Sequence, residues 1–121
     1  MKDIPAQRGK LAETAVLGYL KKHGLKELAR NFTARSGEID LIMLENTTIV
    51  FVEVRSRSSN RFMDTIDTID NRKVRKIIRT SHAFLQHYKG PFESCRFDIV
   101  TLTGKIRSPR IAWLKNAFFD E

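Results

Sequence analysis

Two short apolar segments separated by a polar gap constrain the fold of this chain more than any other feature. Residues 39–44 and 49–54 are rich in Ile, Leu, Val and Phe, and both are shorter than typical helices. They are therefore predicted to be β-strands joined by a turn at residues 45–48. Each strand carries one acid, Asp40 or Glu53, where a buried strand normally carries an aliphatic side chain.

The register of this hairpin decides what the two acids can do. A two- or four-residue loop centred on Asn46 and Thr47 would place Asp40 directly opposite Glu53, on the same face of the sheet. Directly opposed side chains have Cβ atoms about 4.5–5.5 Å apart, and like charges there are destabilising. Two such carboxylates favour a hard divalent cation between them, such as Mg²⁺ or Mn²⁺. A three- or five-residue loop would put the acids on opposite faces instead.

Two other interpretations of the acidic pair stay open. One is a solvated face of the hairpin, and the other is an ion pair with Arg55 or another base. The solvated face is disfavoured because residues on the same face, such as Ile42 and Phe51, are apolar. Both faces of the hairpin are apolar, which predicts a sheet that is covered on both sides.

The rest of the chain predicts two helices and three further strands. The predicted helices are residues 11–23 and 71–88, and the predicted strands are residues 28–33, 97–102 and 111–114. Asp70 is suited to cap the second helix, and residues 56–70 are predicted to be a loop because they are rich in Ser, Asn and Asp. The predicted fold class is α/β or α+β, with a mixed central β-sheet flanked by α-helices, in a single domain spanning residues 1–121.

The first predicted helix adds a third acid. On a helical wheel Glu13 falls between Leu17 and Leu20, at the edge of the apolar face. Its carboxylate is therefore expected to point towards the sheet rather than into water. Pairing with a neighbouring base is the alternative, and it is the commoner arrangement for a carboxylate at such a border.

The second predicted helix has a strongly cationic face. Residues 72–79 contain no acid, and like charges three or four residues apart repel, so a purely structural, solvated face would usually mix signs. Such a face binds phosphate backbones through charge. The whole chain carries 22 Lys and Arg against 14 Asp and Glu, a net charge of +8, which favours nucleic acid as a partner. The basic residues concerned are Arg72, Lys73, Arg75, Lys76 and Arg79.

The cysteine content and the lengths of the apolar runs indicate in which cellular compartment the protein is expected. Cys95 is the single cysteine, so no intramolecular disulfide can form. The first ten residues lack the apolar stretch of a signal peptide, and no apolar run approaches the roughly 20 residues needed to span a bilayer. A cytoplasmic protein without a membrane partner is expected.

Four segments of the chain resemble one bacterial protein family. "GEIDLI" (37–42) and "FVEVRSR" (51–57), followed by "RFDIV" (96–100) and "NAF" (116–118), resemble the YraN-like family. That family belongs by resemblance to the restriction-endonuclease-like PD-(D/E)XK superfamily, near the archaeal Holliday junction resolvases. The resemblance covers nearly the whole chain, and the first two segments in tandem are its most specific part. It implies a restriction-endonuclease-like core of two helices around a mixed four-stranded sheet.

The same resemblance implies an endonuclease that uses Mg²⁺ or Mn²⁺ to hydrolyse phosphodiester bonds in DNA, with branched or damaged DNA among its substrates. By position, Asp40 matches the motif aspartate, Glu53 the acid of the E-X-K element, and Glu13 the helical glutamate of resolvase-like members. All three are implied metal ligands. The motif lysine is replaced by Arg55, which supplies positive charge but cannot act as a base. Lys73 of the second helix is the candidate to replace that lysine in space.

The resemblance leaves the partners and the activity open. The basic helix face, together with Arg57, is expected to hold the DNA backbone, and resolvase-like members imply a homodimer that nothing in the sequence fixes. One rival is a non-catalytic nucleic-acid-binding module that keeps the fold, and Arg55 supports it. The other rival is a protein-interaction domain whose basic face meets an acidic protein. Trp113 and the pair Phe118 and Phe119 are interpreted as core or interface residues rather than base-stacking platforms.

Overall fold

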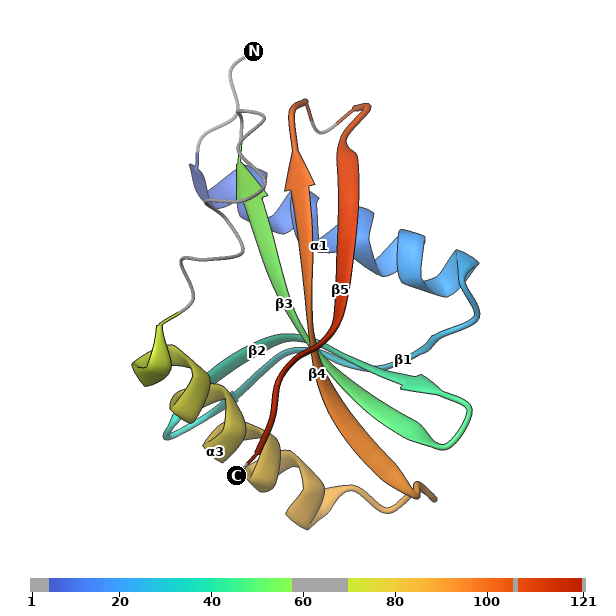
Figure 1. Cartoon of the computed structure of the whole chain (residues 1–121), viewed down its shortest axis with the longest axis vertical. Helices are drawn as coiled ribbons and strands as arrows, with labels where there is room; N and C mark the ends of the chain where they lie inside the picture. Colours follow the sequence, from blue (N-terminus) through green and yellow to red (C-terminus); the bar gives the residue numbers. More distant parts are fainter. Residues whose placement is uncertain (1–4, 58–69, 106, 121) are drawn as a thin grey trace.

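A mixed sheet forms the centre of the molecule (Figure 1). The computed structural model describes residues 5–57, 70–105 and 107–120. Within these ranges five strands form one sheet in the order β1-β2-β3-β4-β5, and two helices pack against it, which confirms the predicted fold class. No helix of the described ranges is both long and apolar enough to cross a membrane. The elements are α1 (Pro5–Lys22), β1 (Lys26–Ala34), β2 (Gly37–Glu45), β3 (Thr48–Arg57), α3 (Asn71–His87), β4 (Ser94–Thr103) and β5 (Arg110–Phe118).

Strand pairing follows the order of the chain. β1, β2 and β3 form an antiparallel meander, β4 runs parallel to β3, and β5 runs antiparallel to β4. A parallel pair needs a crossover connection, and α3 lies within it. In Figure 1, α1 (blue) crosses the sheet behind β3 and β4, whereas α3 (yellow) lies near β2.

The two helices cover opposite faces of the sheet. On one face, Leu20 of α1 packs in a buried cluster with Leu41 of β2. On the other face, Ile77 of α3 packs in a second cluster with Ile42 and Phe51. Because successive residues of a strand point to opposite faces, neighbouring residues of β2 serve different clusters. This arrangement explains why the strands are apolar on both sides.

The predicted element boundaries need several corrections. α1 begins at Pro5 rather than at residue 11, and proline is favoured at the first helical position. α3 ends at His87 rather than at residue 88. The prediction of a loop from residue 56 was wrong for its first two residues, because Ser56 and Arg57 continue β3 in parallel pairing with β4. Residues 58–69 of that predicted loop lie outside the described residues. The other strands extend beyond their predicted ends.

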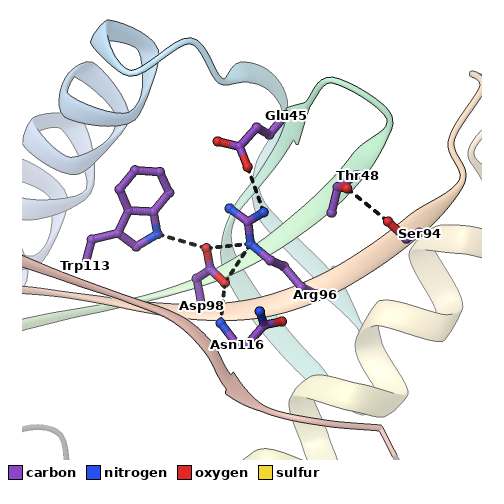
Figure 2. A network of polar contacts seen from close by, with 7 residues as sticks. All are labelled: Glu45, Thr48, Ser94, Arg96, Asp98, Trp113 and Asn116. Atoms are coloured by element: carbon purple, nitrogen blue, oxygen red, sulfur yellow. Dashed lines mark hydrogen bonds and ion pairs between the residues drawn. The ribbon is translucent and has the colours of Figure 1, made fainter.

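A buried carboxylate organises the β4–β5 side of the sheet (Figure 2). Asp98 is fully buried and accepts from Arg96 Nε, at 3.1 Å from each carboxylate oxygen, and from Trp113 Nε1 at 2.8 Å. Its Oδ1 also accepts from the Asn116 N–H at 3.0 Å. Arg96 NH1 in turn donates to Glu45 Oε1 at 2.7 Å, which ties β4 to the end of β2. The network therefore links three strands through one buried charge.

The same network accounts for an irregularity in the sheet. The β4–β5 register shifts between Phe97 and Ile99, directly at Asp98. Asn116 adopts a φ of 54°, a left-handed conformation that Asn tolerates better than most residues. The Asp98 side chain accepts the backbone hydrogen of this bulged residue. A second polar link, between Thr48 Oγ1 and Ser94 Oγ at 2.9 Å, joins the first residues of β3 and β4 (Figure 2).

Candidate metal-dependent active site

The β2–β3 hairpin has the predicted register. Its pairs run from Glu45 opposite Thr48 to Leu41 opposite Val52. Asn46 adopts a φ of 54° in the connecting turn, as tight hairpins require. Asp40 and Glu53 are the next residues of the two strands beyond this last pair. Both acids therefore lie at the end of the ladder, where they line a cavity next to α3.

Regular backbone pairing ends at Asp40 on the β3 side and is interrupted there on the β1 side. The Val54 N–H of β3 donates to Asp40 Oδ2 at 2.8 Å, so a side chain accepts this backbone hydrogen. On β1, Asn31 lies across from Asp40 between two regular pairs and adopts a φ of 53°. Side-chain contacts thus replace part of the ladder at the site.

Burial and the charge of Glu53 both act on the carboxyl group of Asp40. Burial, and then the charge of Glu53, raise the pKa of Asp40 from its usual 3.8 to about 8, and the hydrogen bond from Val54 only partly opposes this. Glu53 itself is only 5% exposed. Asp40 therefore keeps its proton near neutral pH. Such mutual repulsion is the electrostatic condition that a bound divalent cation relieves.

Two basic side chains contact Glu53. Lys73 Nζ of α3 lies 2.6 Å from Glu53 Oε2, and Arg55 Nε of β3 lies 3.6 Å from the same oxygen. The Lys73 side chain is 48% exposed, whereas that of Arg55 is 14% exposed and its Nε has no hydrogen-bond acceptor. Lys73 reaches the acid from the solvent side on a flexible stem, and Arg55 is fixed beside it. The structure thus brings together all four predicted catalytic residues.

Polar and close contacts fix α3 at this position. Ser36 Oγ and Thr80 Oγ1 share a hydrogen bond of 2.7 Å between the β1–β2 turn and the helix. Gly37 has a φ of 147°, and a Cβ there would meet Thr80 Oγ1 at 3.6 Å. Asp70 Oδ1 accepts from the Lys73 N–H at 2.9 Å, which confirms the predicted N-cap. The first turn of α3 is therefore anchored where Lys73 meets the sheet.

A cavity of about 410 Å³ opens between these acids and the first turns of α3. Groups of both charges line this cavity. The carboxylates come from the sheet and from the N-cap of α3, and the basic side chains come from the helix. The positive end of the helix dipole points into this region. The lining residues are Gly37, Glu38, Asp40, Glu53, Asp70, Arg72, Lys73, Lys76 and Ile77.

The third predicted ligand lies apart from the pair. Glu13 Oε1 is 3.8 Å from Arg30 Nε, has no hydrogen-bond partner, and does not line the cavity. Burial raises the pKa of Glu13, and its charge makes a minor contribution to the raised pKa of Asp40. Within the described ranges, no three Asp, Glu, His or Cys side chains gather closely enough to hold a metal ion. The structure thus joins two of the three predicted ligands.

The predicted nucleic-acid contacts divide between two sides of α3. Lys73, Lys76 and Arg72 line the cavity with the acids, whereas Arg75 and Arg79 line a second cavity on the other side of the helix. All five lie on the exposed part of α3. Arg57 ends β3, where it is exposed and its NH1 donates to the Ser56 carbonyl at 3.0 Å. The basic face of α3 is therefore continuous, with a cavity at each side.

Sequence reasoning missed two acids of the cavity. Glu38 and Asp70 both line it, although neither was a candidate site residue and Asp70 was predicted only as a helix cap. The alternation of β2 was a usable signal for Glu38, because it lies two residues before Asp40. No pattern in the sequence linked Asp70 to the acids, since its position depends on how α3 packs against the sheet.

Asp40→Asn is expected to stabilise the metal-free protein at high pH. The folded state keeps the Asp40 proton up to about pH 8, whereas the unfolded chain releases it near its usual pKa of 3.8. This contribution to stability is full below about pH 4 and is lost as the pH rises through about 8. Asn mimics the protonated form, so the variant should exceed wild type by roughly 1–3 kcal/mol at pH 9.

Urea unfolding at pH 5 and pH 9, in EDTA, measures this difference. Glu38→Gln is the matched control, because Glu38 is an exposed carboxylate that lines the same cavity. Parallel pH dependences for wild type and Asp40→Asn would contradict the raised pKa of Asp40.

Comparison with known proteins identifies relatives of the chain. The sequence pattern of the uncharacterised protein family UPF0102 matches residues 12–102. A UPF0102 protein of Pseudomonas putida strain GB-1 is 45% identical over 118 residues, with 94% of each chain covered. A UPF0102 protein of Legionella pneumophila strain Philadelphia 1 is 45% identical over 113 residues, covering 93% of this chain and 94% of its own length. The matched region contains Glu13, Asp40, Glu53 and Lys73.

Proposed function

The chain belongs to the uncharacterised protein family UPF0102, and we propose that it is a metal-dependent DNA endonuclease with a restriction-endonuclease-like core. One observation carries this proposal: Asp40 and Glu53 lie together, mutually repelling, beside Lys73 at the first turn of a cationic helix. Paired carboxylates with a nearby lysine suit phosphodiester hydrolysis, because they combine a cation site with a positive group for the phosphate.

The acidic pair fits a hard divalent cation. Burial, and then the charge of Glu53, raise the pKa of Asp40, and oxygen ligands of this type suit Mg²⁺ or Mn²⁺. Asp40 and Glu53 would hold the cation, and Glu13 would join them only if its side chain left Arg30. When bound, such a cation lowers the pKa of a coordinated water and offsets charge on the phosphate.

The basic groups have different roles in this proposal. Lys73 is exposed enough to leave Glu53 and bind a non-bridging phosphate oxygen, where it offsets the charge that develops during attack. Arg55 is fixed beside Glu53 and holds that carboxylate in position. Arg55 cannot accept a proton, so it does not serve as a base. Lys73 therefore takes the place that the motif lysine holds in the resembled superfamily.

The exposed face of α3 supports DNA as the substrate. Arg72 and Lys76 line the acidic cavity, so a phosphate backbone that follows the helix passes directly over Asp40 and Glu53. The helix N-terminus adds favourable potential for an anion. Arg57 extends this basic region along β3. Binding of this kind depends on charge and is insensitive to base sequence.

Cleavage of a labelled DNA panel tests the proposal. The panel contains a single strand, a duplex, a flap and a four-way junction, each incubated with Mg²⁺, with Mn²⁺ or with EDTA. Metal-dependent cleavage of at least one substrate is the expected result. Arg55→Lys, which restores the motif lysine, reports whether the arginine limits the rate. Binding of DNA without cleavage by either protein would refute the nuclease assignment.

A non-catalytic nucleic-acid-binding module is the second candidate. It is favoured by Arg55 at the motif lysine position and by the 2.6 Å contact of Lys73 with Glu53, which compensates the acid without a metal. Thermal unfolding with millimolar Mg²⁺ or Mn²⁺ distinguishes the two candidates. A cation that binds the folded state raises Tm by mass action, so an unchanged Tm would favour the binding module.

A further inference from the structure

A second cavity lies on the side of α3 that faces away from the acids. It has a volume of about 680 Å³ and is formed between the helix and the end of β5. Its walls include the apolar side chains Val74 and Ile78 of α3 and the aromatic rings of Phe118 and Phe119. The acidic pair lines a different cavity, so this groove plays no part in the chemistry proposed above.

The two aromatic residues at the end of β5 differ in their packing. Phe118 is partly buried, and its ring stacks on Phe97 with centroids 5.0 Å apart. Phe119 follows the strand and is 68% exposed, the largest exposure among the exposed large hydrophobic residues of the described chain. The interpretation of this pair as core or interface residues is confirmed for Phe118, which packs against the core, and stays a prediction for Phe119, whose ring is exposed at the groove.

The rim of the groove is cationic. Arg75 and Arg79 line it, and they are continuous with the basic face that leads over α3 to Lys73. Asp120 also lines the groove, but its Oδ2 lies 2.7 Å from His82 Nε2, so this carboxylate already has a partner. An apolar floor, an exposed aromatic ring and two guanidinium groups therefore lie together.

We propose that this groove binds an unpaired nucleobase, with the base stacked on Phe119 and neighbouring phosphates on Arg75 and Arg79. Every base offers a π-face to an exposed ring, and arginine binds the phosphates next to it. Bases within a duplex are stacked on each other and do not reach such a ring. The inference rests on the proposed function and narrows its substrate class to DNA with a single-stranded segment, such as a flap, a gap or an open junction.

Charge complementarity favours this occupant over a second copy of the chain. Each copy carries a net charge of +8, and the groove borders the most basic helix, so a pair of copies would bring like charges together. A nucleic acid strand instead carries negative charge all along the basic face of α3, from the groove to the acidic cavity. The width of a helix, about 10–12 Å with side chains, separates the groove from the acids. One strand can therefore cross α3 and reach both cavities.

Fluorescence anisotropy tests the inference without catalysis. The probes are a fluorescein-labelled oligothymidine strand and a duplex of equal length, titrated in EDTA at low salt. Phe119→Ala is expected to weaken single-strand binding by roughly 5- to 100-fold and to leave duplex binding within about twofold, since stacking contributes per unpaired base. Phe92→Ala is the matched control, because Phe92 is also exposed, at 40%, and does not line the groove.

The outcomes separate this inference from the proposed function. Equal binding of the single strand by wild type and Phe119→Ala would overturn the base site, even if wild type cleaves DNA. An equal loss on the single strand and the duplex would overturn it as well, since it would indicate phosphate contacts alone. Self-association that disappears in Phe119→Ala, without an effect on single-strand binding, would assign the groove to a second copy. If single-strand binding depends on Phe119 but the protein cleaves no DNA of the panel, the base site is supported and the proposed nuclease activity is refuted.

Discussion

Glu53→Gln is expected to reduce metal-dependent DNA cleavage by about 10³-fold or more. The substitution keeps the size of the side chain but removes the charge that would hold the cation together with Asp40. A catalytic metal contributes several kcal/mol to transition-state stabilisation, and each 1.4 kcal/mol corresponds to about a factor of ten in rate. Single-turnover cleavage of the best substrate of the DNA panel, at saturating Mg²⁺, measures the loss.

Two controls make this result specific. Glu38→Gln removes an exposed carboxylate from the same cavity and should cleave at nearly the wild-type rate. Because Glu53→Gln leaves Arg55 without its charged partner, urea unfolding must show that the variant is folded under the assay conditions. A folded Glu53→Gln protein that cleaves within tenfold of wild type would show that this carboxylate does not carry the reaction.

Asp98→Ala is expected to lower the free energy of unfolding by about 3–5 kcal/mol, the range for breaking a buried charged network. The truncation leaves Arg96 Nε, Trp113 Nε1 and the Asn116 N–H without their common acceptor. Each of these donors loses the hydrogen bond that it makes to a fully buried carboxylate. Urea unfolding at neutral pH measures the change.

The matched control for this network is Glu45→Gln. Glu45 accepts from Arg96 at 2.7 Å but is 26% exposed, and Gln keeps an acceptor there, so a loss below about 1 kcal/mol is expected. A loss below about 1 kcal/mol for Asp98→Ala as well would contradict a structural role for the buried carboxylate. DNA cleavage by the folded fraction should remain, because Asp98 does not line the acidic cavity.

Much of the fold was predictable from local pattern alone. The apolar runs and the turn at Asn46 predict the hairpin and limit its register to a few alignments, because the side-chain period of a strand is two; the structure selects the alignment of the two-residue loop. The extension of β3 through Arg57 was not predictable in this way. Ser56 and Arg57 are polar, and they are strand only because β4 lies beside them, which is a long-range effect.

The candidate site was predictable where it depends on one hairpin and unpredictable where it depends on packing. Asp40 and Glu53 are brought together by the hairpin register, which was one of the two alternatives that the sequence left open. The 2.6 Å contact of Lys73 with Glu53 depends on the position of α3, for which the sequence supplied only a resemblance. The separation of Glu13 from the pair depends likewise on Arg30, a residue of β1 that no periodicity connected to the first helix.

The parallel pairing of β3 with β4 has a consequence for the order of folding. Asp40 and Glu53 meet through a hairpin of nearby residues, whereas Lys73 joins them only after the crossover containing α3 closes, a contact between distant parts of the chain. Asp40 and Glu53 are therefore expected to come together before the ammonium group of Lys73 reaches Glu53. Pulsed amide exchange during refolding should then show protection of the Val54 N–H before that of α3, and simultaneous protection would refute this order. Charge compensation at the site would thus be one of the last steps by which the chain reaches its native state.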